Sequence, residues 1–107
     1  MEQSLQETRF DEYGLLRHPE DWSPELASEL ARQEAIPHLT DLHWAFIDSL
    51  RNYYGKYRVP PPAGLICHDL ELDEWCCHDL FHNCLNAWRI AGLPDPGEEA
   101  KAYMSAE

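Results

Sequence analysis

The densest group of residues that could do chemistry lies in "ICHDLELDEWCCHDLFHNC", which holds all four cysteines and three of the six histidines. His78 and His82 are four positions apart, so on a helix they share one face, which Glu74 extends by one turn. Two imidazoles and a carboxylate are able to hold zinc. The spacing matches no zinc knuckle or ribbon, however, and a solvated polar helix face explains the three side chains equally well. Both interpretations remain open at this point.

The four cysteines also raise the question of disulfides. On one continuous helix Cys77 and Cys84 lie about 10.5 Å apart along the axis, whereas a disulfide needs Cα atoms closer than about 7 Å. Cys76 and Cys77 are adjacent and point about 100° apart on a helix. Only Cys67, on the preceding helix, can therefore reach another cysteine. With no export signal in the sequence, reduced thiols are the default expectation.

A third possibility is a reactive thiol, which needs a nearby cation or a helix start to favour the thiolate. Cys76 and Cys77 fall in the first turn of an expected helix. Cys84 falls in the middle of that helix on its apolar face, with Arg89 as the nearest cation. The alternative for each cysteine is a small buried hydrophobic residue.

Two helices precede the cysteine-rich segment. The stretch "DWSPELASELARQEAI" predicts a helix with Ser23 as N-cap and Pro24 at its first position, ended by Pro37. A longer helix begins at Thr40 and continues to Tyr57. Its predicted apolar stripe consists of Leu42, Phe46, Leu50, Tyr53 and Tyr57, widened by Trp44 and Ile47. This aromatic stripe predicts that the second helix is central to the core.

The cysteine-rich segment itself predicts a helix, a short turn and another helix. Three prolines place the start of the first of these at Pro62 or Ala63, and it should end near Leu70. Asp73 should cap the second, which ends at Gly92. Its expected apolar face consists of Cys77, Leu80, Phe81, Cys84, Trp88 and Ala91. The pair resembles a helix-turn-helix.

The ends of the chain complete the predicted fold. "TRFDEYGLLR" indicates a short β-hairpin that must pack on the helices. The polar residues after Pro94 predict an extended C-terminal arm. We therefore expect an α+β, mostly helical protein, in which residues 1–94 form one domain with a hairpin on a small helical bundle, and residues 95–107 form the arm.

Charge and composition narrow the classes of partner. The 107 residues carry a formal net charge of −12, which repels phosphate backbones. Arg89 and Lys101 are the only basic residues after Arg58, so the helix-turn-helix-like pair has almost no cations with which to read DNA, and we expect no direct DNA binding. No apolar run is long enough to span a membrane, and the N-terminus has no secretory pattern. We expect a cytoplasmic protein without a cofactor.

Several longer motifs are similar to the sulfur-relay family that includes TusE, DsrC and DsvC. They are "DEYGLL" with "DWSPELASELA", then "LTDLHWAFIDSLRNYYGKYRVPP", and "LF" leading to "AWRIAGLPDP". The resemblance implies a small, cytoplasmic, non-enzymatic protein that carries sulfur on a cysteine of a flexible C-terminal arm. It implies a sulfur-handling partner, either a sulfite reductase or a sulfurtransferase relay component. In some members a second cysteine lies on the last helix before "AGLP".

This sequence departs from that pattern at both cysteine positions. The arm position falls near Glu99 and the helix position at Trp88, so neither holds a thiol. The best candidates for an internal sulfur-carrying residue are Cys84 first, then Cys77 and Cys76. Two hypotheses follow. Either the protein docks on its partner as a regulator or accessory, or it carries a persulfide on an internal cysteine. The alternative from another class is a small Cys/His metal-binding or redox-sensing protein on the same scaffold.

Overall fold

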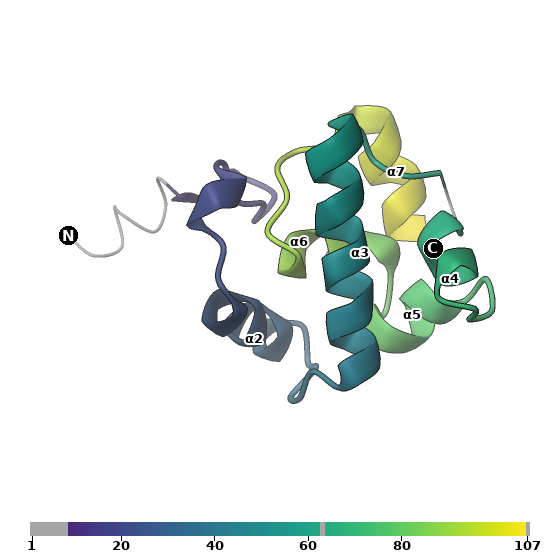
Figure 1. Ribbon diagram of the computed structural model, residues 1–107. Helices are drawn as coiled ribbons and strands as arrows, with labels where there is room; N and C mark the ends of the chain where they lie inside the picture. The colour runs from purple at the N-terminus through teal and green to yellow at the C-terminus, as the bar shows by residue number, and fades with distance from the viewer. Residues whose placement is uncertain (1–8, 63, 107) are drawn as a thin grey trace.

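The computed structural model describes residues 9–62 and 64–106, and its regular elements are helices (Figure 1). In chain order these are η1 (Pro19–Asp21, a 3-10 turn), α2 (Pro24–Gln33), α3 (Asp41–Tyr57), α4 (Leu65–Asp69), α5 (Cys76–Phe81), α6 (Cys84–Ile90) and α7 (Glu98–Ala106). Helix α3 runs through the middle of the molecule, with α2 on one side and α4 and α5 on the other (Figure 1). None of the described helices is long and apolar enough to cross a membrane.

The first two helices begin where the sequence predicts. The Ser23 hydroxyl accepts a hydrogen bond from the Leu26 N–H at 3.1 Å, and Pro24 occupies the first position of α2. Thr40 caps α3 in a capping box whose reciprocal partner is His43. These capping residues are sufficient to predict the two helix starts, because each side chain bonds to a backbone N–H within one helical turn.

The buried face of α3 is rotated from the predicted stripe. Its buried residues are His43, Phe46, Ile47 and Leu50, whereas Leu42 and Tyr57 are 46% and 52% exposed. The largest fully buried side chains of the whole core are Trp88, Phe81, Leu15, Leu16, Ile47, Ile90 and Leu93. Most of them lie outside α3, so the core forms where the C-terminal helices and the N-terminal turn close around that helix.

The predicted β-hairpin is wrong, and with it the α+β class. Among the described residues the only β pairing is a single antiparallel bridge between Phe10 and Leu16. The Asp11 carboxylate accepts hydrogen bonds from the N–H groups of Tyr13 and Leu15, at 2.8 and 3.0 Å. An aspartate that bonds the backbone ahead of it favours a tight loop over a strand ladder. The segment is a turn that packs Leu15 into the core.

The predicted helix from Asp73 to Gly92 is two helices instead of one. His82 has a φ of 76° and ends α5, and Asn83 caps α6 by accepting from the Asn86 N–H at 2.7 Å. The Asn86 side chain then donates to the Phe81 carbonyl at 3.0 Å, which satisfies an acceptor at the end of α5. A capping asparagine inside the apolar pattern thus breaks the helix and separates Cys77 from Cys84.

Two further boundaries differ from the prediction. Helix α4 begins at Leu65 after Gly64, and the alternative start at Ala63 lies outside the described residues. The C-terminal segment is not extended, because Glu98–Ala106 forms α7, which packs against α6. Ala100 and Met104 are buried on its inner side. Their burial at helical spacing gives the segment the apolar face that it needs for order.

Candidate functional site

Three of the four cysteines meet at one apolar pocket of about 40 Å³. Cys67 comes from α4, Cys77 from α5 and Cys84 from α6. The other lining residues come from α3, α4, α6, α7 and the turns on either side of α4. They are Phe46, Leu50, Pro61, Pro62, Gly64, Ile66, Glu74, Trp88, Tyr103 and Met104. The pocket therefore depends on segments that are far apart in sequence.

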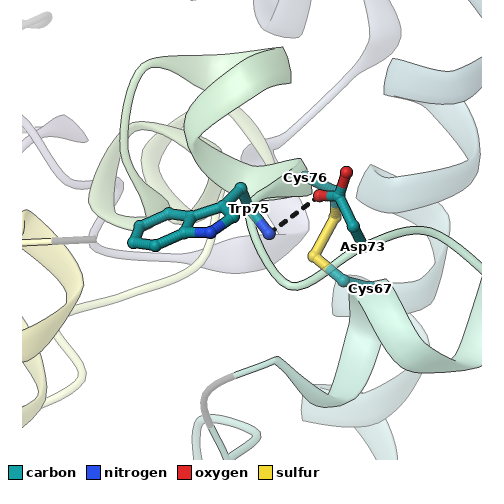
Figure 2. Close-up of a disulfide and its surroundings, with 4 residues drawn as sticks. All are labelled: Cys67, Asp73, Trp75 and Cys76. Carbon is teal, nitrogen blue, oxygen red and sulfur yellow. Dashed lines mark hydrogen bonds between the residues drawn. A yellow bond between two sulfur atoms is a disulfide. The ribbon is translucent and has the colours of Figure 1, made fainter.

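Cys67 and Cys76 form a disulfide with their Cα atoms 5.8 Å apart (Figure 2). It closes the turn between α4 and α5, where the Asp73 carboxylate accepts from the Trp75 N–H at 2.9 Å. Cys67 is the residue that the sequence predicted could reach a partner. The default expectation of four reduced thiols does not hold, and Cys76 has no thiol to offer while this disulfide persists.

Cys77 and Cys84 are thiols with different exposure. Cys77 is 7% exposed, whereas Cys84 is partly exposed at the start of α6. Of the described residues that line the pocket, only Glu74 is charged at neutral pH. Apolar walls and a carboxylate both disfavour a thiolate. The lining of the pocket thus surrounds its thiols with apolar side chains and one carboxylate.

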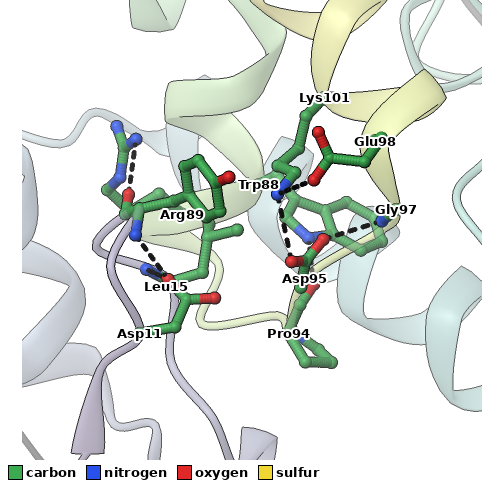
Figure 3. A network of polar contacts seen from close by, with 10 residues as sticks. Asp11, Leu15, Trp88, Arg89, Pro94, Asp95, Gly97, Glu98 and Lys101 are labelled. Atoms are coloured by element: carbon green, nitrogen blue, oxygen red, sulfur yellow. Dashed lines mark hydrogen bonds and ion pairs between the residues drawn. The ribbon is translucent and has the colours of Figure 1, made fainter.

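Arg89, the cation expected near Cys84, is occupied elsewhere (Figure 3). Its guanidinium donates to the Asn86 side chain at 2.7 Å and to the Tyr13 carbonyl at 3.1 Å, and it lies 3.5 Å from the Glu34 carboxylate. These contacts join α6 to α2 and to the N-terminal turn. Arg89 therefore has a structural role, which the sequence did not reveal.

The predicted metal ligands are not brought together. His82 lies at the α5 C-cap with a positive φ, so it no longer continues the helical face of His78. His78 instead lies beside Asp79 at 3.8 Å and makes an edge-on ring contact with Trp75. Across the described ranges no group of three or more His, Cys, Asp or Glu side chains could hold a metal ion. The alternative of a metal-binding site at Glu74, His78 and His82 is not supported.

A buried histidine positions the cysteine-bearing helices. The Thr40 N–H donates to His43 Nδ1 at 3.0 Å, so the ring proton resides on Nε2 and is donated to the Leu80 carbonyl at 2.7 Å. His43 also packs edge-on against Phe81 at 5.1 Å between ring centroids. Helix α3 thereby fixes the end of α5, between Cys77 and Cys84.

The turn Ile90–Pro94, here called the junction, holds α6 and the C-terminal segment in place. The Trp22 indole donates to the Ile90 carbonyl at 2.9 Å, and Arg51 donates to the Ala91 carbonyl at 2.7 Å. The Arg51 guanidinium also lies 4.2 Å from the centroid of the Trp22 ring. This "AGLP" signature is therefore a structural element, fixed by residues from the first half of the chain.

The two positions at which the family pattern places cysteines have opposite environments. Trp88 is fully buried, and its indole N–H donates to the Pro94 carbonyl at 2.6 Å (Figure 3). Glu99 is exposed on α7. Replacement of a helix cysteine by Trp88 thus fills the core, whereas replacement of an arm cysteine by Glu99 leaves a charged group in solvent.

Lys101 attaches α7 to the rest of the protein, and only 7% of this residue is exposed. Its ammonium lies 3.1 Å from the carboxylates of Asp95 and Glu98 and 3.3 Å from the centroid of the Tyr13 ring (Figure 3). Burial lowers the pKa of Lys101, but its hydrogen bonds to Asp95 and Glu98 outweigh this and raise the pKa overall. Lys101 was the residue that sequence reasoning missed; its position as the last cation in an acidic segment was the available signal.

The contact between Asp95 and Lys101 should make the docking of α7 sensitive to acid. A backbone hydrogen bond from Gly97, then the side chain of Lys101, holds the pKa of Asp95 below its ordinary value. Stability from a carboxyl with a lowered pKa is present above its unfolded value, about 4, and is lost as the pH falls through the folded value. We expect the Gly97 amide resonance to report α7 undocking below about pH 4.

Two matched variants test this assignment at neutral pH. Asp95→Asn should shift the Gly97 amide and expose Met104 to oxidation, whereas Glu98→Gln should change little, since the Glu98 side chain is 86% exposed. Equal effects of the two substitutions would contradict the assigned role of Asp95.

Comparison with known proteins identifies the family. A family model described as "DsrC like protein" matches residues 2–98. The chain belongs to the DsrC-like family. The sulfurtransferase TusE of Sodalis glossinidius is 38% identical over 105 residues, which cover 90% of this chain and 96% of the relative. The gamma subunit of the dissimilatory-type sulfite reductase of Nitratidesulfovibrio vulgaris is 30% identical over 88 residues, covering 80% of this chain and 84% of that subunit.

Solved structures agree with this assignment. The oxidized gamma subunit of the dissimilatory sulfite reductase (DsrC) from Archaeoglobus fulgidus superposes with a TM-score of 0.73 at 34% identity. The match covers 84% of this chain and 90% of that one. A chain of dissimilatory sulfite reductase I (DsrI) gives a TM-score of 0.76 at 28% identity, covering 82% of this chain and 86% of that one. The chain is thus a sulfur-relay family protein, as its sequence motifs indicated.

Proposed function

We propose that this member of the DsrC-like family has no catalytic activity of its own and docks on a sulfur-handling partner as a regulator or accessory protein. The observation that carries the proposal is the position of Glu99, an exposed carboxylate where the family pattern places the arm thiol. The surrounding segment is helical and fastened by Lys101. A carrier must insert its sulfur into a partner, and a docked helix without a thiol supplies neither the sulfur nor the reach.

The partner is proposed from the relatives. One of these is called a sulfurtransferase and another the gamma subunit of a sulfite reductase, so we propose a sulfite reductase or a sulfurtransferase relay component. The net charge of −12 favours a basic protein surface on that partner and disfavours direct DNA binding. We place this interaction in the cytoplasm, where the family's sulfur relay operates.

A second candidate function is an internal persulfide carrier. Supporting it, Cys77 and Cys84 line one pocket, where an added sulfur atom would be shielded from solvent thiols. Cys84 is the stronger candidate because it is partly exposed, whereas Cys77 is buried. Cys76 becomes a candidate only once its disulfide with Cys67 is opened. In this carrier a partner would reach the sulfur at the partly exposed Cys84.

The two functions are separated by a docking assay combined with intact-mass measurement. In the accessory function the chain should displace the gamma subunit from purified dissimilatory sulfite reductase, while a persulfide donor leaves its mass unchanged. Addition of about 32 Da, one sulfur atom on a thiolate, would favour the carrier instead. Loss of that addition in Cys84→Ser but not in Cys77→Ser would assign it to Cys84.

A gain-of-function variant serves as the control. Glu99→Cys should accept one sulfur from the same donor, because residue 99 is exposed and its helix dipole favours a thiolate in the first turn. Failure of the native chain to compete with the gamma subunit or with TusE for any partner would contradict the accessory function.

A further inference from the structure

The disulfide has no part in the function proposed above, yet one of its two sulfurs belongs to the pocket. Cys67 lines the pocket together with Cys77 and Cys84, whereas its partner Cys76 does not. The pocket therefore meets the disulfide from the Cys67 end. Two thiols and one half of a disulfide thus line the same pocket.

Solvent has little access to this disulfide. Cys67 is 2% exposed and Cys76 is 4% exposed. Tyr103 and Met104 of α7 also line the pocket. Because exchange rates depend on access to the sulfur under attack, a small thiol in solution is a poor attacker here. A thiol already inside the pocket does not have this obstacle.

Exposure separates the two pocket thiols. Cys77 is 7% exposed, whereas Cys84 is partly exposed, and a thiol in contact with solvent loses its proton at a lower cost than a buried one. Cys84 belongs to α6 and reaches the pocket from a different helix. Helix α5 ends at His82, where φ is 76°, so the backbone changes direction between the two thiols.

We propose that the pocket is an intramolecular thiol–disulfide exchange centre, in which the Cys84 thiolate attacks the Sγ atom of Cys67. The Cys84 thiol first loses its proton. A Cys67–Cys84 bond forms, the Cys67–Cys76 bond breaks, and Cys76 leaves as a thiolate that takes up the proton. One disulfide and two thiols are present before and after, so no external oxidant or reductant is consumed.

Exchange changes which thiol is available. Before it, Cys84 is a thiol at the pocket; after it, Cys76 is a thiol at the first residue of α5. Cys76 then lies next to Trp75, which is 59% exposed. The link between α4 and α5 is also replaced by one between α4 and α6.

The exchange is tested by disulfide mapping of the full chain, without a sulfur donor or partner. This makes its outcome independent of the proposed docking function. In Cys76→Ser, the thiol of Cys67 has lost its partner, and oxidation with diamide should produce a Cys67–Cys84 disulfide. The control Cys76→Ser/Cys84→Ser should lose this disulfide. A Cys67–Cys77 disulfide, or Cys67 recovered only as a thiol in a folded variant, would overturn the proposal.

The wild-type chain provides a test that does not depend on folding of the variant. After incubation near the ordinary thiol pKa, about 8.5, and quenching with iodoacetamide, a fraction should carry Cys67–Cys84 with Cys76 alkylated. The same species should persist in Cys77→Ser and be absent in Cys84→Ser. Recovery of Cys67–Cys76 alone at all incubation times would refute exchange.

Discussion

Gly92→Ala is expected to lower the free energy of unfolding by about 3 kcal/mol or more, because the new Cβ atom would both strain the backbone and clash with a neighbouring side chain. Gly92 has a φ of +72°, which an L side chain adopts at a cost of about 1–2 kcal/mol. A Cβ there would also lie 2.1 Å from Trp22 Cδ1. The indole cannot move aside easily, because it donates to the Ile90 carbonyl and lies against Arg51. Chemical denaturation followed by circular dichroism measures the loss.

Gly64→Ala is the matched control for Gly92→Ala. Gly64 has a similar φ of +81°, but a Cβ there would meet nothing within 4 Å. This variant should lose only the cost of the left-handed conformation, about 1–2 kcal/mol. Equal losses in the two variants would show that the contact of Trp22 with the junction has no energetic weight.

Trp88→Ala is expected to cost about 3–5 kcal/mol, the range for removing a large aromatic side chain from a packed core. Trp88 is fully buried, lies edge-on to Tyr54 at 5.6 Å between ring centroids, and donates to the Pro94 carbonyl. Its loss removes a wall of the cysteine pocket and an anchor of the C-terminal segment. Alkylation of Cys77 and Cys84 should therefore become faster in this variant.

Trp75→Ala supplies the comparison for Trp88→Ala. Trp75 is 59% exposed, so its removal should change the free energy of unfolding by no more than about 0.5 kcal/mol. If Trp75→Ala lowered the free energy of unfolding as much as Trp88→Ala, the burial of the two side chains would not explain their contributions to stability.

Local signals in the sequence predicted local features correctly. Ser23 and Thr40 cap their helices because each satisfies an N–H group within one turn, and this needs no distant partner. The sequence motifs also identified the family, which the match over residues 2–98 confirms. Where a competing local interaction was overlooked, the prediction was wrong. The Asp11 side chain stabilises a turn where a β-hairpin was expected, and Asn83 caps α6 where one long helix was expected.

The candidate site depends on tertiary contacts that the spacing of residues in the sequence does not predict. Spacing predicted that Cys67 alone could reach another cysteine, but the pairing with Cys76 follows from the turn that brings α4 to α5. Arg89, the cation nearest to Cys84 in the sequence, contacts Asn86, the Tyr13 carbonyl and Glu34 of the segment after α2. Equally, the end of α5 at His82, where φ is 76°, removed the helical face that His78 and His82 were expected to share.

The sequence by itself determined the starts of α2 and α3, the family, the net charge and the absence of a thiol at position 99, because each can be read from residue types and local motifs without knowing how the helices pack. The tertiary structure decided that Cys67, Cys77 and Cys84 share a pocket, that Lys101 of α7 contacts Asp95 and the ring of Tyr13, and that Trp22 fixes the junction. Most of these contacts join residues far apart in sequence. Their geometry is set by how the helices pack around α3, and packing is a property of the whole chain.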